Sequence, residues 1–233
     1  MSTSHLTRSF GTSLVGAILI MAFLVGSFFS LEPQVGRAIS TNFVVSQQIT
    51  NEISFIATTS ATTMVGSIAG LTGGYATGTN LTVVNTNNAT GYNMTITFPT
   101  TTSGRAMQAS STAYIDDYLP AGGAPTSTDF TFTDPTAGTA SRFGFTVRAS
   151  TSNEVASYFM NNGSACNTGS NETDNRCWAR PSTTVLTIIN SSAPNPSSTT
   201  TLKFRVAVPS NPSPALPQGF YYATGTLTAT VNP

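Results

Sequence analysis

From about Ile39 to the end of the chain, apolar residues alternate with polar ones, which is typical of strands that bury one face. The clearest run is Thr200–Val208, and similar runs occupy Tyr92–Phe98, Arg142–Arg148 and Tyr221–Val231. In the clearest run, the residues that share the apolar face are Leu202, Phe204, Val206 and Val208. Threonine fills much of the opposite faces, where its β-branched side chain favours strands and hydrogen-bonds water. The alternation therefore predicts a mainly β structure.

Shorter runs of apolar and β-branched residues predict further strands. Further strands are predicted at Asn51–Thr58, Leu81–Thr86, Phe130–Thr133 and Thr184–Asn190. Many short strands separated by Gly and Pro turns indicate an all-β, antiparallel β-sandwich, Ig-like or jelly-roll-like. A division into two smaller sandwiches near Gly122–Thr128 is the alternative that the length allows.

The segments between these strands carry turn and helix signals. Asn87–Gly91 has the composition of a hairpin loop. One short helix is predicted over Ser152–Asn161, with Ser152 as its cap and Gly163 ending it. Residues 99–128 and 190–198 are expected to be loops, because Pro, Ser and Thr are frequent there.

An uncharged run from Ser9 to Leu31 precedes the alternating part, with Arg8 before it and Glu32 after it. About 20 apolar residues can cross a bilayer as a helix. The same run with a basic residue before it is also typical of a signal peptide, and Gly36–Ala38 offers a small-x-small cleavage site. We therefore expect residues 1–38 to be a signal peptide or membrane anchor and residues 39–233 to be an extracellular domain. The protein would be extracytoplasmic, either secreted or held at the membrane by its N-terminal helix.

Charge narrows the possible partners. Charged residues make up 8% of the chain and the net charge is zero, against roughly 25% charged residues in an average soluble protein. Nucleic-acid binding needs clustered basic residues, whereas this chain has one lysine, Lys203, and scattered arginines. No nucleic-acid partner is expected. The partners that remain are other copies of the chain, surface glycans and, through an uncleaved N-terminal segment, the membrane.

Catalytic groups are few. The only histidine, His5, precedes the apolar run, so serine and cysteine mechanisms that need histidine and His-ligated metal sites are not expected in the exported part. Lys203 falls on a polar strand face, which does not favour a serine–lysine pair. The remaining candidates are carboxylates: Glu52, Asp116, Asp117, Asp129, Asp134, Glu154, Glu172 and Asp174. Since their spacing selects no pair, we expect no catalytic residue, no cofactor and no metal site.

Two alternatives use these carboxylates. A glycosidase would need two of them across a cleft. A calcium site would use the oxygens of Asn171, Glu172 and Asp174, although these do not follow a known calcium-loop pattern.

Cys166 and Cys177 are the only cysteines. Two thiols alone do not make a zinc site, and the Cys-x-x-Cys spacing of redox proteins is absent. Outside the cytoplasm such a pair predicts a structural disulfide that closes a short loop.

Several segments carry a family resemblance. They are Ile49–Phe55, Ser67–Gly74, Thr86–Thr95, Asn162–Gly169, Leu202–Val206, Pro209–Pro212 and the threonine-rich last strand. In these segments the chain resembles uncharacterised exported, threonine-rich β-sandwich surface proteins of small-genome candidate-phylum bacteria. The resemblance implies a secreted or surface-held protein and brings no activity with it. Pro217–Tyr221 and the threonines after it are also similar to spore-coat and WxL-type surface sandwiches, but Trp178 is followed by Ala179-Arg180, so the W-x-L motif is lacking.

These observations predict a cell-surface protein with a structural or adhesive role and no catalysis. Phe220 and Tyr222 form a candidate contact strip. A glycan-binding module is one alternative. Another is a filament subunit in which Ile39–Ile49, containing Phe43, Val44 and Val45 and no charge, adds as a strand to a neighbouring copy. Within one molecule the same segment would be the first strand of the sandwich.

Overall fold

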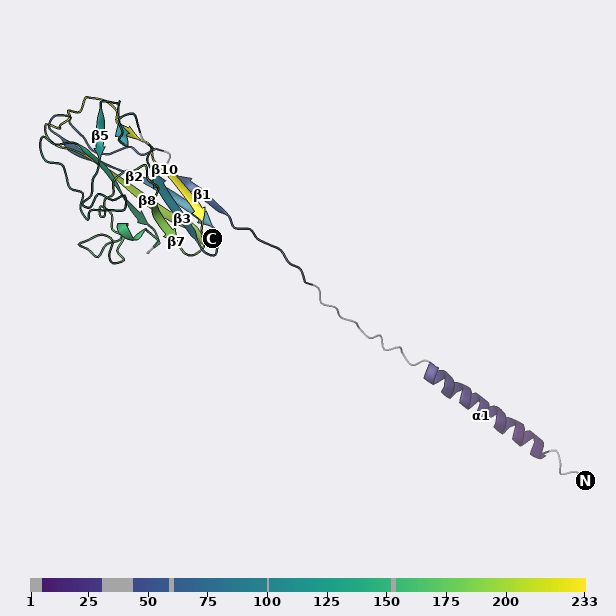
Figure 1. The fold of residues 1–233 in the computed structure, drawn as a ribbon. Helices are drawn as coiled ribbons and strands as arrows, with labels where there is room; N and C mark the ends of the chain where they lie inside the picture. Colours follow the sequence, from purple (N-terminus) through teal and green to yellow (C-terminus); the bar gives the residue numbers. More distant parts are fainter. Residues whose placement is uncertain (1–5, 31–43, 59–60, 100, 152–153) are drawn as a thin grey trace, which may run out of the picture. The chain divides into compact units, whose positions relative to one another are not determined.

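The computed structural model describes residues 6–30, 44–58, 61–99, 101–151 and 154–233 (Figure 1). The chain forms two compact units, Met1–Gln48 and Ile49–Pro233. In the first unit the helix α1 covers Leu6–Ser30. Among the residues described, no helix meets the length and apolarity that a membrane crossing requires. The predicted cleavage site, Gly36–Ala38, and the first residues of the predicted arm, 39–43, lie outside the described residues.

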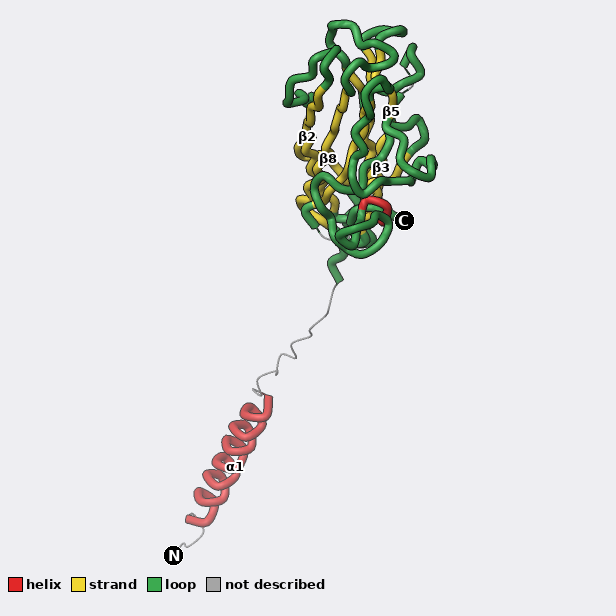
Figure 2. The backbone as a smooth tube through the Cα atoms, turned by 90° about the vertical axis from the view of Figure 1, so that its left-hand side faces the viewer, coloured by secondary structure: helices red, strands yellow, loops and turns green. Residues whose placement is uncertain are grey.

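The second unit is mainly β, as the alternation predicts. Its elements are β1 (Ile53–Thr58), β2 (Gly74–Thr86), β3 (Tyr92–Thr97), β4 (Met107–Gln108), β5 (Tyr114–Asp117), β6 (Arg142–Ala149), the 3₁₀ turn η1 (Ser157–Phe159), β7 (Leu186–Ser191), β8 (Asn195–Val208), β9 (Tyr222–Ala223) and β10 (Thr226–Val231). Loops make up much of the unit between these strands (Figure 2).

The strands form two sheets. The larger has seven strands in the order β1-β2-β8-β6-β5-β4-β9, and the smaller has three in the order β10-β3-β7. All pairs are antiparallel except β5 and β6, which run parallel. The prediction of a purely antiparallel arrangement is therefore wrong at this pair, because a long connection leads from β5 to β6 and brings the chain back in the same direction.

The longest strands, β2 and β8, pair from Gly74 opposite Val208 to Thr86 opposite Asn195. β6 covers the other edge of β8. The inward faces of β8 and β6 carry Leu202, Val206, Phe143, Phe145 and Val147, all buried. The predicted inward face is confirmed at these positions, whereas Phe204 is only half-buried and Ala207, on the predicted polar face, is buried.

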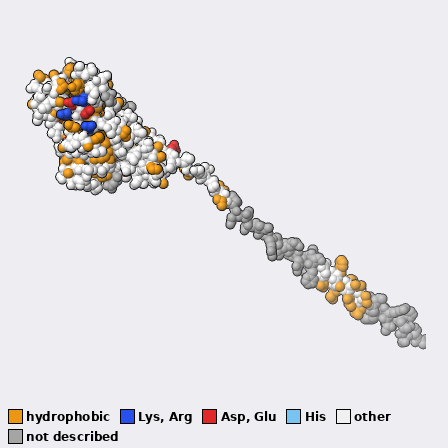
Figure 3. Space-filling model, in the orientation of Figure 1, with side chains coloured by type: hydrophobic (Ala, Val, Ile, Leu, Met, Phe, Trp, Pro, Cys, Tyr) orange, Lys and Arg blue, Asp and Glu red, His pale blue; other side chains and the backbone are white. Residues whose placement is uncertain are grey.

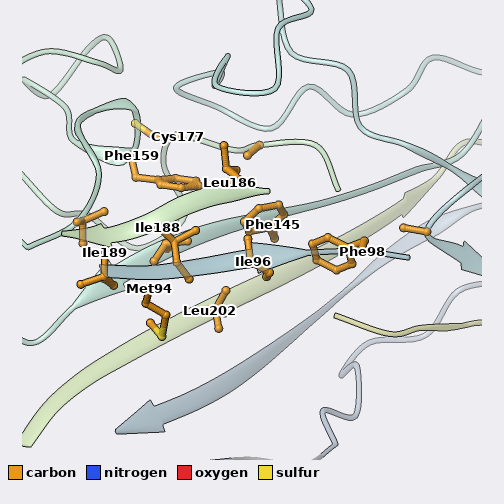
Figure 4. Close-up of a cluster of buried hydrophobic side chains, with 14 of the residues drawn as sticks. Met94, Ile96, Phe98, Phe145, Phe159, Cys177, Leu186, Ile188, Ile189 and Leu202 are labelled. Carbon is orange, nitrogen blue, oxygen red and sulfur yellow. The ribbon is translucent and has the colours of Figure 1, made fainter. Parts of the chain in front are cut away.

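Side chains from both sheets share one core. Met94, Ile96 and Phe98 come from β3 and the residue after it, and Ile188 comes from β7. They lie against Phe145 and Leu202 of the larger sheet (Figure 4). Rings of Phe98 and Phe145 are 5.5 Å apart between centroids. Burial of these apolar side chains is the main force that holds the sheets together.

The predicted hairpin at Asn87–Gly91 is a different kind of turn. It connects β2 of the larger sheet with β3 of the smaller one, so the two strands do not pair. Asn88 Nδ2 donates to the Gly91 carbonyl at 2.7 Å and to the Asn232 carbonyl at 2.8 Å. Asn and Gly residues here turn the chain from one sheet to the other. The same residue types are typical of hairpin loops, so the amino-acid composition cannot distinguish the two kinds of turn.

The short helix predicted over Ser152–Asn161 is present only in part. Among the described residues of this range, Ser157–Phe159 form one 3₁₀ turn that begins after Ala156 without a side-chain cap, and the others are not helical. Ser152, the predicted cap, lies outside the described residues. Val155 is buried and forms a β-bridge with Ile189 of β7. The backbone at Val155, where the predicted helix would have its first turn, therefore pairs with the smaller sheet instead.

Three loop or strand assignments also differ. β4 and β5 lie within residues 99–128, and β8 begins at Asn195 inside the second predicted loop. Phe130–Thr133 is not a strand; its buried Phe132 stacks on Tyr118, with ring centroids 4.3 Å apart. The last run is interrupted at Thr224–Gly225, so that β9 belongs to one sheet and β10 to the other.

Candidate functional site

The candidate carboxylates are distributed over the unit and most have structural partners. Arg205 binds both carboxylate oxygens of Asp134 at 2.7 and 2.9 Å, and Arg148 pairs with Asp174 at 3.3 Å. Asp129 accepts a hydrogen bond from the Tyr118 hydroxyl at 2.6 Å. These contacts fix loops and strand surfaces.

Asp116 and Asp117 are neighbours on β5 and their carboxylates have different partners. Asp116 binds Arg105 at 2.5 Å and lies 3.8 Å from Arg142. Asp117 accepts a hydrogen bond from the backbone N–H of Ala106 at 3.0 Å. Burial raises the pKa of Asp117, and the hydrogen bond from Ala106 opposes that change only in part. Both carboxylates thus hold the Arg105–Ala106 segment against β5.

Each of the three residues of the calcium alternative has a protein partner. Glu172 accepts a hydrogen bond from the backbone N–H of Ala149 at 3.0 Å, Asp174 binds Arg148, and Asn171 pairs through its backbone with Asn161. In the described part of the chain, no three His, Cys, Asp or Glu side chains lie close enough together to hold a metal ion.

Cys166 and Cys177 form a disulfide, as predicted, with Cα atoms 5.6 Å apart. Cys177 is fully buried in the core beside Phe159 (Figure 4). Asn161, between β6 and β7, forms β-bridges with both Cys166 and Asn171. The disulfide therefore ties a folded loop directly to the core.

Apolar side chains line an open cavity of about 610 Å³, which we call the edge hollow. Its lining includes residues of β1, β2, β3, β6, β8 and β10: Phe55, Thr58, Thr82, Ile96, Phe143, Leu202, Phe204 and Leu227. A second cavity of about 520 Å³ adjoins it and shares Met64, Met107 and Tyr221. Together they occupy the end of the core where loops replace the smaller sheet.

Apolar side chains also lie exposed around these cavities. Phe220, which lines the second cavity, is 94% exposed, and Tyr222, which lines the edge hollow, is 61% exposed. Leu71 and Val65 are exposed on the loop that leads to β2. On the face in Figure 3, hydrophobic side chains are scattered among polar ones, and most of the visible charged side chains lie in one small group.

The edge hollow opens between two sheet edges. β1 ends the larger sheet and β10 ends the smaller one, and they lie side by side (Figure 1). The hollow could not be found from the sequence, because its lining comes from strands and loops far apart in the chain. The one available signal was the prediction that Phe220 and Tyr222 form a contact strip.

Chemically, this site suits an apolar or aromatic ligand with few charges, and the carboxylates do not contribute to it. Lys203, on the opposite face of β8 from Leu202, does not line either cavity. Comparisons with protein-family models, with curated proteins and with solved structures found no match to this chain.

Proposed function

We propose that the chain is an exported cell-surface protein with a structural or adhesive role and no catalysis, and that Ile49–Pro233 is a two-sheet sandwich. The observation that carries the proposal is the Cys166–Cys177 disulfide. Disulfides persist in oxidising compartments and are rare in the cytosol. The uncharged run Ser9–Leu31, which follows the basic Arg8, would supply the export signal.

The surface supports the same role. The outward face of β10 carries the exposed threonines Thr226, Thr228 and Thr230. Hydroxyl groups hydrate such a face without attracting nucleic acid or other strongly charged ligands. Exposed aromatic side chains, Phe220 and Tyr222, offer contact points for a neighbouring surface.

The compartment is tested in cells that make the full chain with a C-terminal epitope tag. External protease should remove the tag from intact cells, and a non-reduced digest should contain the peptides of Cys166 and Cys177 linked together. A tag that survives until the cells are lysed, together with free thiols at both positions, would overturn export.

Adhesion is tested by comparing the sedimentation of cells that make the full chain with cells that make Phe220→Ser/Tyr222→Ser. We expect the native chain to promote clustering and the variant to lose most of it. Thr136→Ser, which changes an exposed loop residue, is the matched control. Equal clustering by all three would exclude a contact role for the aromatic pair.

A glycan-binding module is the second candidate, favoured by the same exposed aromatic rings, since rings of this type stack on sugars. A glycan array with the full chain separates the two. Saturable binding to one sugar class, lost in the Phe220→Ser/Tyr222→Ser variant, would establish the module and replace the purely structural role.

A further inference from the structure

At one end of the core, the faces that the two sheets turn toward each other become polar. On β8, Ser198 and Thr200 share the inward face with Leu202, and all three are at most 1% exposed. On β3, Tyr92 precedes Met94 on the inward face and is also fully buried. Met94 and Leu202 belong to the apolar core in Figure 4. The buried polar side chains therefore continue the core beyond its apolar part.

A buried carboxylate lies beside these hydroxyl groups. Glu154 is 7% exposed, and its two carboxylate oxygens accept hydrogen bonds from Ser191, Asn195 and Ser198. Among the described residues, no Arg or Lys forms an ion pair with it. Only hydrogen bonds from neutral donors therefore compensate for the loss of water around this charge.

Two hydroxyl groups at the same place have no hydrogen-bonding partner in the described part of the chain. They are Tyr92 Oη and Thr200 Oγ1, and both atoms are buried. Burial raises the pKa of Tyr92, the nearby hydroxyls of Ser198 and Thr200 oppose this change, and the charge of Glu154 adds to it. These three side chains thus surround the phenol, although none forms a direct hydrogen bond with it. We call Tyr92, Glu154, Ser198 and Thr200 the polar layer.

The unpaired hydroxyls indicate what kind of ligand the polar layer can hold. A buried hydroxyl without a partner is costly, and folded proteins rarely contain one. Tyr92 and Thr200 each have an O–H proton to donate, and therefore need an acceptor. A cation offers no acceptor, whereas a water oxygen has two lone pairs and can accept both protons.

The other half of the polar layer can receive the two hydrogens of the same water. Ser198 Oγ gives its own proton to Glu154 Oε2, so both lone pairs of this hydroxyl remain available. The carboxylate oxygen also has capacity for a second donor. Two donors and two acceptors therefore meet at one place, which is the set of partners that a single water satisfies.

We propose that the polar layer binds one buried water molecule, which accepts hydrogen bonds from Tyr92 and Thr200 and donates to Ser198 and Glu154. Buried waters typically make about three hydrogen bonds to groups that would otherwise be unsatisfied. This water links β3 of the smaller sheet, β8 of the larger sheet and the segment before η1. The site is separate from the edge hollow and does not depend on the surface role proposed above.

The direction of the stability change in Tyr92→Phe tests the site, because this substitution removes only the phenol oxygen. With water bound, the loss of one partner should raise the equilibrium constant for unfolding of the full chain about fivefold or more in urea denaturation. Without water, removal of an unsatisfied buried hydroxyl should lower this constant. Tyr75→Phe, on a side chain that is 60% exposed, is the matched control and should leave it unchanged. An unfolding constant that stays equal or falls in Tyr92→Phe would overturn the proposal.

Thr200→Val provides a second test of direction and a double-mutant cycle. Alone, it should also raise the unfolding constant, since it removes the other donor to the water. Tyr92 and Thr200 have no direct hydrogen bond, so a shared water should couple their losses. The fold-change in Tyr92→Phe/Thr200→Val should be at least about threefold smaller than the product of the two single fold-changes. Fold-changes that simply multiply would show that the two hydroxyls share no partner, which contradicts the proposed water.

Exchange of the salt distinguishes water from a cation in the polar layer. With water bound, the unfolding constant of the native chain should be the same in NaCl, KCl and choline chloride at equal concentration, with or without CaCl₂. Suppose instead that one cation lowers the unfolding constant about tenfold and has no such effect on Tyr92→Phe. A cation would then occupy the site, because a ligand that binds only the folded state stabilises it, and the water proposal would be wrong.

Discussion

Ser198 on β8 donates a hydrogen bond from Oγ to Glu154 Oε2 at 2.7 Å, although 44 residues separate them in the chain. The other oxygen of Glu154 accepts from Ser191 Oγ at 2.9 Å and from Asn195 Nδ2 at 3.2 Å. Ser191 belongs to β7 of the smaller sheet, and Glu154 is only 7% exposed. One buried carboxylate therefore joins the two sheets through neutral donors.

Replacing Glu154 with alanine should lower the free energy of unfolding by about 2–4 kcal/mol, because buried donors lose their acceptor. Glu154→Gln retains one acceptor oxygen and should cost about half as much. Urea denaturation of both variants measures the difference. Equal stability of Glu154→Ala and the native chain would show that water replaces the carboxylate.

The disulfide should contribute about 2–3 kcal/mol to the free energy of unfolding, since it closes a short loop. The double variant Cys166→Ala/Cys177→Ala should lose this amount in urea denaturation. Addition of a strong reductant should destabilise the native chain by a similar amount and leave the double variant unaffected. A reductant effect on the double variant would contradict this assignment.

Asp117 should make stability depend on pH. Burial raises its pKa above the usual 3.8, so the folded state binds the proton more tightly than the unfolded state. Below the pKa that Asp117 has in the unfolded chain, the carboxyl is protonated in both states and the folded state is not destabilised. The free energy of unfolding then falls as the pH rises through the pKa of Asp117 in the folded state.

Asp117→Asn removes this ionisation while its amide oxygen can still accept from Ala106. The free energy of unfolding of the variant, relative to the native chain, should therefore increase between about pH 3 and about pH 7. Urea denaturation across this range measures it. A difference that stays constant with pH, or that decreases, would contradict the buried environment assigned to Asp117.

Gly91→Ala should be among the most destabilising small substitutions. Gly91 has φ +78°, and a Cβ atom there would lie 2.1 Å from the carbonyl oxygen of Ser191. Gly104 has φ +72° with no atom within 4 Å of such a Cβ, so Gly104→Ala reports the cost of the backbone conformation alone. We expect about 1 kcal/mol for Gly104→Ala and at least about 3 kcal/mol for Gly91→Ala. Thermal unfolding of both variants measures the two losses. Equal losses of stability in Gly91→Ala and Gly104→Ala would show that the Asn87–Gly91 turn moves away from Ser191 and relieves the clash.

Sequence patterns predict strands that bury a single face, although they indicate only Leu81–Thr86 of β2, which begins at Gly74. β3 is the best example, with Tyr92, Met94 and Ile96 buried at every second position. β6 is less simple: Gly144 and Thr146 on its other face are also buried. Thr146 Oγ1 donates to the carbonyl of Arg176, so a loop covers that face, and alternation cannot show which loops fold back.

The start of β8 could not be predicted for a different reason. Pro196 argues against a strand interior, because it lacks a backbone N–H. The pairing with β2 is irregular at this point, between Val84 and Thr86, so the missing donor is tolerated. β4 and β5 are too short to give a periodic signal, and they depend on long-range partners such as β9 and β6.

The candidate site likewise has one part that the sequence predicts and one part that it does not. The two cysteines were recognisable because their chemistry depends on residue type, and the structure confirms their bond. The edge hollow depends on the space between two strand edges from opposite ends of the unit, β1 and β10. Only the three-dimensional arrangement reveals that space.

The Asn87–Gly91 corner also has a mechanical consequence. Asn87 holds Thr50 and Glu52 where the chain enters the unit, and Asn88 holds the Asn232 carbonyl where β10 has ended. A pulling force applied between residues 50 and 232 would load these asparagine side chains first and would leave the β2–β8 ladder largely unstressed. A force between residue 50 and the loop at Phe220 would instead be transmitted across the length of the sheets. The same unit should therefore yield readily to tension in one direction and resist it in the other.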